Sequence, residues 1–325
     1  MKLNIAYACD DNYIAHTGIS ILSLLDNNQT VNEITIYLIS VNISSTNINA
    51  IQSIVDKFKR ILIVLPFKEL CPNLKLSSVG RHIETVYAKL FFGNIKDVNK
   101  IIYFDSDIII NGSLEEMWNI DLGDNYFGLV KTITKDSVLK LGLKKSESFY
   151  NDGVAIVNSE KLREDDMQQL FLKFIDFYNG NPPVLSEGTI NVVCQGRIKT
   201  IHPKFNFGTS FLMHKNRSLN LISNEKEYYP SKIIDEARHN PIVIHYLAGW
   251  FMRPWELGST HPLKNKYFEY KQQTIWKNEP LKFKKLSTKL KFLKFISAIL
   301  PIEIVKFIID AFKKTKKWSN NVEVF

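Results

Sequence analysis

One stretch of the chain places two acidic residues inside a run that is otherwise almost wholly apolar. The run from Ile101 to Ile110, with the letters IIYFDSDIII, has the composition of a buried strand. Carboxylates are costly to bury without partners. Side chains two residues apart on a strand point the same way, so a slight kink would bring Asp105 and Asp107 to one ion. Such oxygen ligands suit Mg²⁺ or Mn²⁺. The alternative is that both aspartates cap a following helix that begins near Ser113.

Size and composition indicate a globular protein with a large core. The chain has 325 residues, of which 45% are hydrophobic, enough for one large domain or one and a half. Its three cysteines, Cys9, Cys71 and Cys194, show no metal-ligand spacing and favour a reducing compartment. The first apolar run is short and ends in acids, which is unlike a signal peptide. With no uninterrupted apolar run of membrane-spanning length, we expect a cytoplasmic protein.

The positive charge is concentrated at the C-terminal end. Of the net charge of +9, residues 281–325 carry +8, from eleven lysines and three acidic residues, which leaves +1 for residues 1–280. A nearly neutral main domain argues against nucleic-acid binding. Lysines interleaved with Phe and Trp over 281–325 are typical of a segment that lies on an anionic membrane surface. The alternative is a helix packed on the main domain with lysines on its outer face.

The order of elements predicts a mostly parallel sheet with helices on its faces. Strands are expected at 3–8, 33–41 and 61–65, and helices at 14–25 and from 44 to about 58. This alternation is typical of α/β proteins, whose ligands bind beyond the carboxyl ends of the strands. The acidic residues that follow the first strand and those of the 101–110 run therefore converge on one edge. Further helices are expected at 81–92 and 161–178, and further strands at 126–131, 154–157 and 242–245.

Several motifs in register resemble glycosyltransferase family 8, over roughly residues 1–270. The resemblance implies a GT-A fold and a retaining enzyme that uses nucleotide-activated galactose or glucose, as in bacterial lipopolysaccharide synthesis. The motifs that carry it are ACDDNY at 8–13, TVYAKL at 85–90, YFDSD at 103–107, DLGDN at 121–125, YNDGV at 150–154, GTIN at 188–191, HY at 245–246 and RPW at 253–255.

The resemblance also implies roles for individual residues. It assigns uridine binding to the end of the first strand, at Ala8, Asp10, Asn12 and Tyr13, where polar groups and a ring for stacking make chemical sense. A capped helix start is the alternative there. It assigns manganese, or magnesium, to both aspartates of the 101–110 run together with a late histidine, which is His245.

Other matched positions would contact the donor. Arg253 stands for the usual lysine near the pyrophosphate, and its guanidinium suits phosphate. Lys89 stands for a common arginine that contacts the donor, with a solvated helix lysine as the alternative. Asn151 matches a contact to the donor sugar, with an ordinary turn asparagine as the alternative.

The chain departs from the family pattern around the sugar. Ser186 and Glu187 stand where family members often have Asp-Gln, Thr132 replaces an aspartate that often touches sugar hydroxyls, and Asp152 occupies a position that is usually small. These changes are expected to alter donor choice or activity. Glu187, with Ser186 beside it, is the candidate catalytic residue, as a nucleophile or ion-pair stabiliser. The alternative is a helix-start carboxylate favoured by the helix dipole.

The prediction is a metal-dependent hexosyltransferase. Residues 1–275 would form a GT-A domain that moves a hexose from a UDP-sugar to a glycan acceptor, including lipid-linked acceptors, and residues 276–325 would hold it on the inner face of the plasma membrane. A non-catalytic protein that binds sugar nucleotides or serves as a membrane scaffold is the alternative. A nucleotidyltransferase has less support, because no glycine-rich phosphate loop follows the first strand.

Overall fold

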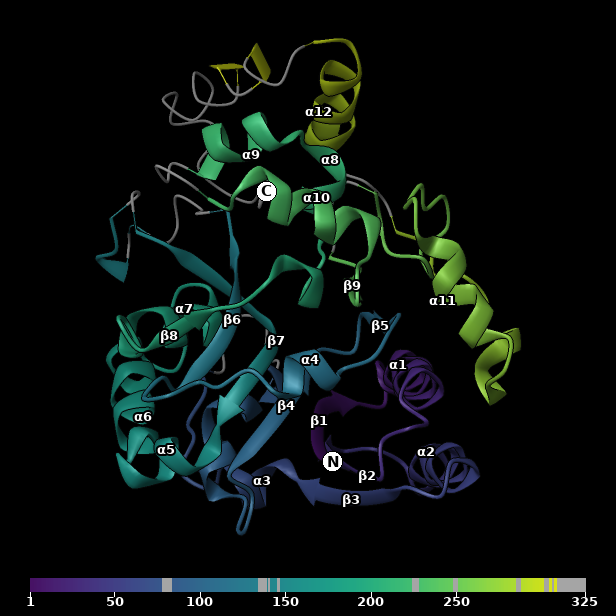
Figure 1. The fold of residues 1–325 in the computed structure, drawn as a ribbon, viewed down its shortest axis with the longest axis vertical. Helices are drawn as coiled ribbons and strands as arrows, with labels where there is room; N and C mark the ends of the chain where they lie inside the picture. The colour runs from purple at the N-terminus through teal and green to yellow at the C-terminus, as the bar shows by residue number, and fades with distance from the viewer. Residues whose placement is uncertain are drawn as a thin grey trace.

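The fold is built around a central sheet, which runs through the lower half of Figure 1. The computed structural model describes residues 1–77, 84–133, 139, 141–144, 147–223, 228–247, 251–284, 288–300, 304–305 and 307–308. Within these residues the sheet has seven strands in the order β3-β2-β1-β4-β7-β6-β8. The strands are β1 (Lys2–Asp10), β2 (Glu33–Val41), β3 (Ile61–Pro66), β4 (Lys100–Phe104), β6 (Phe127–Thr132), β7 (Phe149–Asn158) and β8 (Ile198–Thr200).

The sheet is mostly parallel, as the alternation of elements predicted. Strands β3, β2, β1 and β4 pair in parallel, while β7 is antiparallel to both β4 and β6. A short antiparallel pair, β5 (Ile108–Ile110) with β9 (Val243–His245), stands beyond the end of β4. This pair lies between the large sheet and the helices at the top of Figure 1.

Helices cover both faces of the sheet, with α1 and α2 on one side and α5, α6 and α7 on the other (Figure 1). Successive side chains of a strand point to opposite faces of the sheet. In β4, Ile102 accordingly packs in the hydrophobic core beneath α1 and α2, and Ile101 packs in the core beneath α6 and α7. The helices are α1 (Ile14–Asn27), α2 (Ser45–Lys57), α3 (Phe67–Leu70), α4 (Glu115–Trp118), α5 (Ser159–Glu164), α6 (Met167–Phe177), α7 (Leu185–Val193), α8 (Thr209–Met213), α9 (Asn216–Ser223), α10 (Ser231–His239), α11 (Lys264–Lys271) and α12 (Thr288–Ile299), with short 3₁₀ helices η1 (Glu84–Asn94), η3 (Pro203–Phe205) and η4 (Ile275–Asn278).

Three expected elements differ from those observed. The 101–110 run is not one strand, because it breaks into β4 and β5 at the two aspartates. The helix expected at 161–178 is two helices, α5 and α6, separated where Asp166 takes a left-handed φ of 46°. The helix expected at 81–92 is the 3₁₀ helix η1, and its expected first residues, 81–83, lie outside the described residues.

The basic C-terminal region is described in part. Helix α12 covers the first of its two expected amphipathic pieces, and most of the second piece, 302–318, lies outside the described residues. Among the residues that the structure describes, no helix is both long enough and apolar enough to cross a bilayer.

Candidate active site

The break in the 101–110 run is held by contacts on three sides. On one side, the backbone N–H of Asp105 donates to the carbonyl of Gly153 at 2.8 Å. The Thr17 hydroxyl of α1 donates to that of Ser106 at 2.8 Å, and on the third side Ile108 pairs with His245. The chain therefore turns out of the sheet directly after β4, and the turn carries both aspartates.

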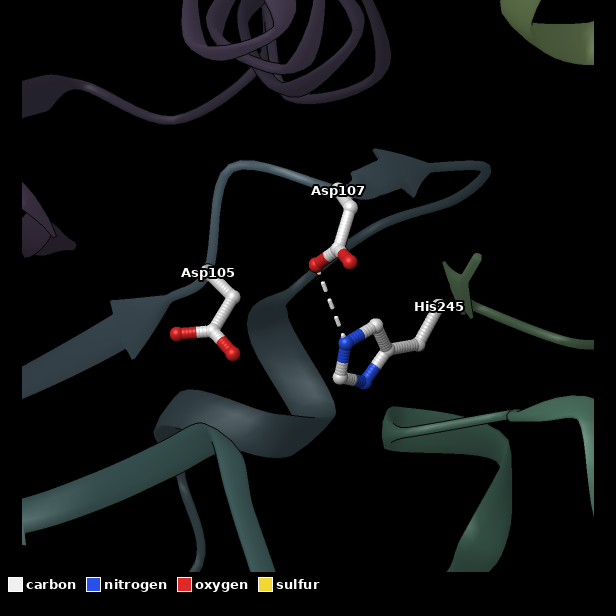
Figure 2. Close-up of side chains that lie close together, drawn as sticks. All are labelled: Asp105, Asp107 and His245. Atoms are coloured by element: carbon white, nitrogen blue, oxygen red, sulfur yellow. Dashed lines mark hydrogen bonds and ion pairs between the residues drawn. The ribbon is translucent and has the colours of Figure 1, made fainter. Parts of the chain in front are cut away.

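Asp105, Asp107 and His245 point toward one another from the ends of three strands (Figure 2). One ligand atom from each lies within 4.8 Å of the other two, and His245 Nε2 is 3.1 Å from Asp107 Oδ1. Asp107 and His245 are buried, while Asp105 is partly exposed. Neither aspartate caps the following helix, whose N-cap is Leu114, so the capping alternative is wrong.

Arg253 forms an ion pair with Asp107 in the same cluster. Its Nη2 and Nε lie 2.7 and 3.1 Å from Asp107 Oδ2. Burial by itself raises the pKa of Asp107, but the charges of Arg253 and His245 outweigh that effect and hold the pKa well below its ordinary value. Glu256 accepts from the backbone N–H of Arg253 at 2.9 Å, which fixes the loop that carries the guanidinium.

Lys89 is a buried cation and not a solvated helix lysine. Its side chain is 1% exposed, and Nζ lies 3.0 Å from Asp152 Oδ2 and 3.7 Å from Asp105 Oδ1. Burial lowers the pKa of Lys89, but the nearby carboxylates more than offset this and raise it. Ser186 donates its hydroxyl to Asp152 at 2.6 Å. Two departures from the family pattern, Asp152 and Ser186, are therefore in contact with each other.

The end of β1 forms the second part of this sheet edge. Asp10 accepts from the backbone N–H groups of Asn12 and Tyr13 at 3.0 and 3.2 Å. Tyr13 itself occupies the N-cap of α1 without a side-chain cap bond, so Asp10 and Asn12 shape a turn before the helix. Ala8 is buried within β1. Lys282 donates to the Asn12 carbonyl at 3.3 Å and stands 6.0 Å from the Tyr13 ring centre.

Asn151 and Glu187 also belong to the cluster. Asn151 Nδ2 donates to Glu187 Oε2 at 2.8 Å, so Asn151 is not an ordinary turn asparagine. Thr132 is half-buried at the end of β6 and pairs with Phe149. Among the described contacts, none joins Thr132 to the residues around Asp107.

Sequence reasoning missed Asn206, which is buried and bonds to both Asn151 and His245 at 2.8 Å. The available signal was a polar residue between Phe205 and Phe207, in a segment that the aromatic pair predicts to be buried. Sequence reasoning also missed Lys282 as a neighbour of the strand-end turn, because it counted Lys282 only with the basic region.

The sequence model of the family described as Glycosyl transferase family 8 matches residues 4–258, which is most of the chain and contains all of these site residues except Lys282. The chain belongs to glycosyltransferase family 8. This confirms the family that the motifs predicted. The general activity of a glycosyltransferase follows from membership.

The chain is also similar in sequence to bacterial proteins with different names. General stress protein A of Bacillus subtilis is 25% identical over 285 residues, which cover 84% of this chain and 94% of that protein. Lipopolysaccharide 1,2-glucosyltransferase of Escherichia coli is 23% identical over 295 residues, 86% of this chain and 80% of that protein.

A solved structure of galactosyltransferase LgtC, with donor and acceptor sugar analogues, resembles this fold. Its TM-score is 0.68 at 20% identity, and the match covers 89% of this chain and 99% of LgtC. At that identity the likeness establishes the fold, and it confirms the predicted GT-A architecture.

Proposed function

We propose that the protein is a metal-dependent, retaining glycosyltransferase that moves a hexose, galactose or glucose, from a UDP-sugar to a hydroxyl of a glycan acceptor. The observation that carries the proposal is the meeting of Asp105, Asp107 and His245 at a sheet edge of a family 8 enzyme. A lipopolysaccharide acceptor is suggested by the name of one relative, lipopolysaccharide 1,2-glucosyltransferase, and the proposal includes lipopolysaccharide core and other surface glycans, lipid-linked ones among them.

The donor set supports a divalent cation. Two carboxylates and one imidazole suit Mn²⁺ or Mg²⁺. The charge balance agrees, because the four carboxylates and two cations of the cluster leave a formal charge of −2. These charged residues are Asp105, Asp107, Asp152, Glu187, Lys89 and Arg253. In this proposal the cation, when bound, offsets charge on the departing diphosphate.

The chain's own residues would hold the donor on either side of that position. The turn at Asp10, Asn12 and Tyr13 offers polar groups and an exposed ring to the uridine. Ala8, the remaining residue proposed at the uridine, lies buried in β1 just before this turn. Arg253 is close enough to the aspartates to meet a diphosphate there, since it already contacts Asp107. A phosphate could exchange with that carboxylate as its partner.

The sugar would lie toward the cluster around Lys89. Asn151, Asp152 and Thr132 are the proposed sugar contacts, and Glu187 with Ser186 the proposed catalytic pair. The support is that Lys89, Asp152 and Ser186 form one hydrogen-bonded group, to which Asn151 and Glu187 lie adjacent in sequence. Activity of Glu187→Ala within a few-fold of wild type would remove Glu187 from any catalytic role.

The deciding experiment measures UDP release from a panel of UDP-sugars, with Mn²⁺ and with chelator. We expect turnover of one donor that requires the metal and is lost in Asp107→Ala. The matched control is Asp124→Ala, an exposed aspartate in a surface turn. Tight UDP binding without turnover of any donor, even with acceptor-bearing cell extract, would favour the non-catalytic alternative.

We also propose that residues 276–325 hold the catalytic part, residues 1–275, on an anionic membrane at the inner face of the plasma membrane. Among the described residues, large apolar side chains of this region face solvent, with Phe283 80%, Phe295 65% and Phe307 75% exposed. Exposed rings beside lysines suit a lipid interface.

Liposome binding tests the membrane proposal. A chain that ends at Lys284 retains the contacts of Lys282 and Lys284 with the main fold. Because the deletion also removes buried Ile296 and Val305, thermal unfolding must first establish that the shortened chain folds. Full-length protein should bind anionic liposomes and be released by salt, and the shortened chain should not bind. Equal binding by both chains would refute the proposal.

A further inference from the structure

A line of hydrogen-bonded polar side chains, buried except for half-buried Asn151, connects Glu187 with the histidine of the candidate metal site. Asn151 Nδ2 lies 2.8 Å from Glu187 Oε2, Asn206 Nδ2 lies 2.8 Å from Asn151 Oδ1, and His245 Nδ1 lies 2.8 Å from Asn206 Oδ1. The other ring nitrogen of His245, Nε2, faces Asp107 at 3.1 Å. Figure 2 shows that Nδ1 is turned away from both aspartates.

The direction of donation along this line is fixed by a backbone group. The N–H of Gly153 donates to Asn151 Oδ1 at 3.2 Å, and a backbone N–H can only donate. Asn151 must therefore present its oxygen on this side, where it also accepts from Asn206. Since Asn206 uses its NH₂ group toward Asn151, its oxygen faces His245. An amide oxygen can only accept, so His245 must carry a proton on Nδ1.

We propose that Asn206 is a positioning residue that holds His245 as the tautomer with its proton on Nδ1, so that the Nε2 lone pair is directed to the metal. This inference rests on the proposed metal site. A histidine that binds a metal through one nitrogen commonly donates through the other, and that partner fixes the ring orientation and the tautomer. Here the partner is a neutral amide, itself oriented by Asn151.

The backbone around Asn206 supports this role, because it is bonded to the strand that carries His245. The backbone N–H of Phe207 donates to the carbonyl of Val243 at 2.8 Å, and that of His245 donates to the carbonyl of Phe207 at 3.1 Å. Asn206 is 4% exposed and His245 1% exposed. The side chains of Asn206 and His245 are bonded to each other, and the backbone segments that carry them are also bonded to each other. This double connection preorganises the ligand before a metal binds.

The line also links two parts of the site that are far apart in sequence. Any rotation of the His245 ring changes the hydrogen bond to Asn206, and through Asn151 it reaches the Glu187 carboxylate. The inferred function of the line is thus to keep the metal ligand and the candidate catalytic carboxylate in one fixed arrangement. A direct measurement of metal binding tests it without reference to turnover.

The test titrates full-length protein with Mn²⁺ and follows the free ion by electron paramagnetic resonance. Asn206→Leu keeps the approximate volume but removes both hydrogen bonds, and it should weaken Mn²⁺ binding about 10- to 100-fold. Asn206→Asp keeps an oxygen acceptor toward His245 and should bind Mn²⁺ more tightly than Asn206→Leu. His245→Ala should lose the site.

The matched control is Asn28→Leu. Asn28 is also buried, at the end of α1, and its side chain donates to Leu24 at 2.9 Å and accepts from Leu114 at 2.8 Å. It should lower thermal stability as Asn206→Leu does but leave Mn²⁺ affinity unchanged, which separates a folding defect from loss of positioning.

Three outcomes would overturn the inference. If Asn206→Leu binds Mn²⁺ like wild type while His245→Ala does not, the proposed metal site stands and the role of Asn206 falls. If Asn206→Leu and Asn206→Asp weaken binding equally, the acceptor oxygen is not what matters. If His245→Ala binds Mn²⁺ normally, the metal site and the inference fall together.

Discussion

Replacing Gly153 with alanine would place one methyl group inside the candidate metal site. A Cβ at this position would lie 2.4 Å from His245 Cε1, 2.7 Å from Asp105 Oδ2 and 3.2 Å from Asn151 Oδ1. Carbon atoms in contact are ordinarily about 3.5–4.0 Å apart, so the imidazole would have to retreat by roughly 1 Å. Strand β7 therefore approaches the candidate metal ligands as closely as it does because residue 153 has no side chain.

The cost of Gly153→Ala can be worked out from these contacts. Asp105 is partly exposed but accepts a hydrogen bond from the Tyr103 hydroxyl at 2.7 Å, and the His245 ring is buried between Asn206 and Asp107. A shift of that size would weaken the hydrogen bond from His245 to Asn206, which is worth about 0.5–1.5 kcal/mol. Overpacking adds about 1–3 kcal/mol, and alanine recovers about 0.5–1 kcal/mol of the glycine entropy cost. We expect the free energy of unfolding to fall by about 1–3 kcal/mol.

The effect on Mn²⁺ binding should be larger than the effect on stability suggests. The substitution would displace two candidate ligands together. Loss of a residue that supports a metal ligand typically weakens metal affinity about 10- to 100-fold, so we expect the affinity for Mn²⁺ to fall at least about 10-fold. Titration with Mn²⁺ measures the affinity, and urea denaturation measures the stability. The matched control is Gly128→Ala in β6, where a Cβ would lie 2.9 Å from Leu122 and touch only apolar side chains. Wild-type Mn²⁺ affinity in Gly153→Ala would refute the geometry described for His245 and Asp105.

Two further predictions concern buried ionisable side chains, one charged and one neutral. Lys89→Met should lower the free energy of unfolding by about 3–5 kcal/mol because it leaves buried Asp152 without its cation, and Lys89→Met with Asp152→Asn should recover part of that loss in urea denaturation. Burial lowers the pKa of His16 from 6.5 to about 3, so between these values the unfolded chain binds a proton that the folded chain does not. Stability should therefore fall by about 2 kcal/mol from pH 7 to pH 5 through this group. His16→Phe should remove that part of the pH dependence, whereas exposed His239→Gln should not.

Much of the fold could be predicted because hydrophobic pattern determines it locally. The first strands and helices followed from apolar periodicity, and the parallel sheet followed from their alternation. The 101–110 run was predicted as buried, yet its break at Asp105 was not, because the break depends on Ile108 pairing with a strand more than 130 residues later. The break separating α5 from α6 depends on the left-handed backbone at Asp166, which the helical pattern of the side chains does not reveal.

The sequence could predict a residue of the candidate site only where that residue stands in a recognisable sequence motif. The aspartates and His245 had such positions, and the structure brings them together. Asn206 had none, because its role lies wholly in its two partners. The same holds for the ion pair between Arg253 and Asp107, since the sequence predicted a phosphate contact for Arg253 but gave no sign of its partner in the protein.

Asp152 and Ser186 show most directly why partners matter. In the sequence they are separate departures from a family pattern, 34 residues apart, and each by itself suggested a weakened sugar site. In the structure the Ser186 hydroxyl lies 2.6 Å from Asp152 Oδ2, and the same carboxylate oxygen pairs with Lys89. A carboxylate on β7 can therefore supply negative charge at the place where helix α7 presents only a hydroxyl. The two residues form one coupled feature, and exchanging either alone would leave buried Lys89 or Asp152 poorly compensated. Their effect on donor choice must accordingly be tested with both changed together.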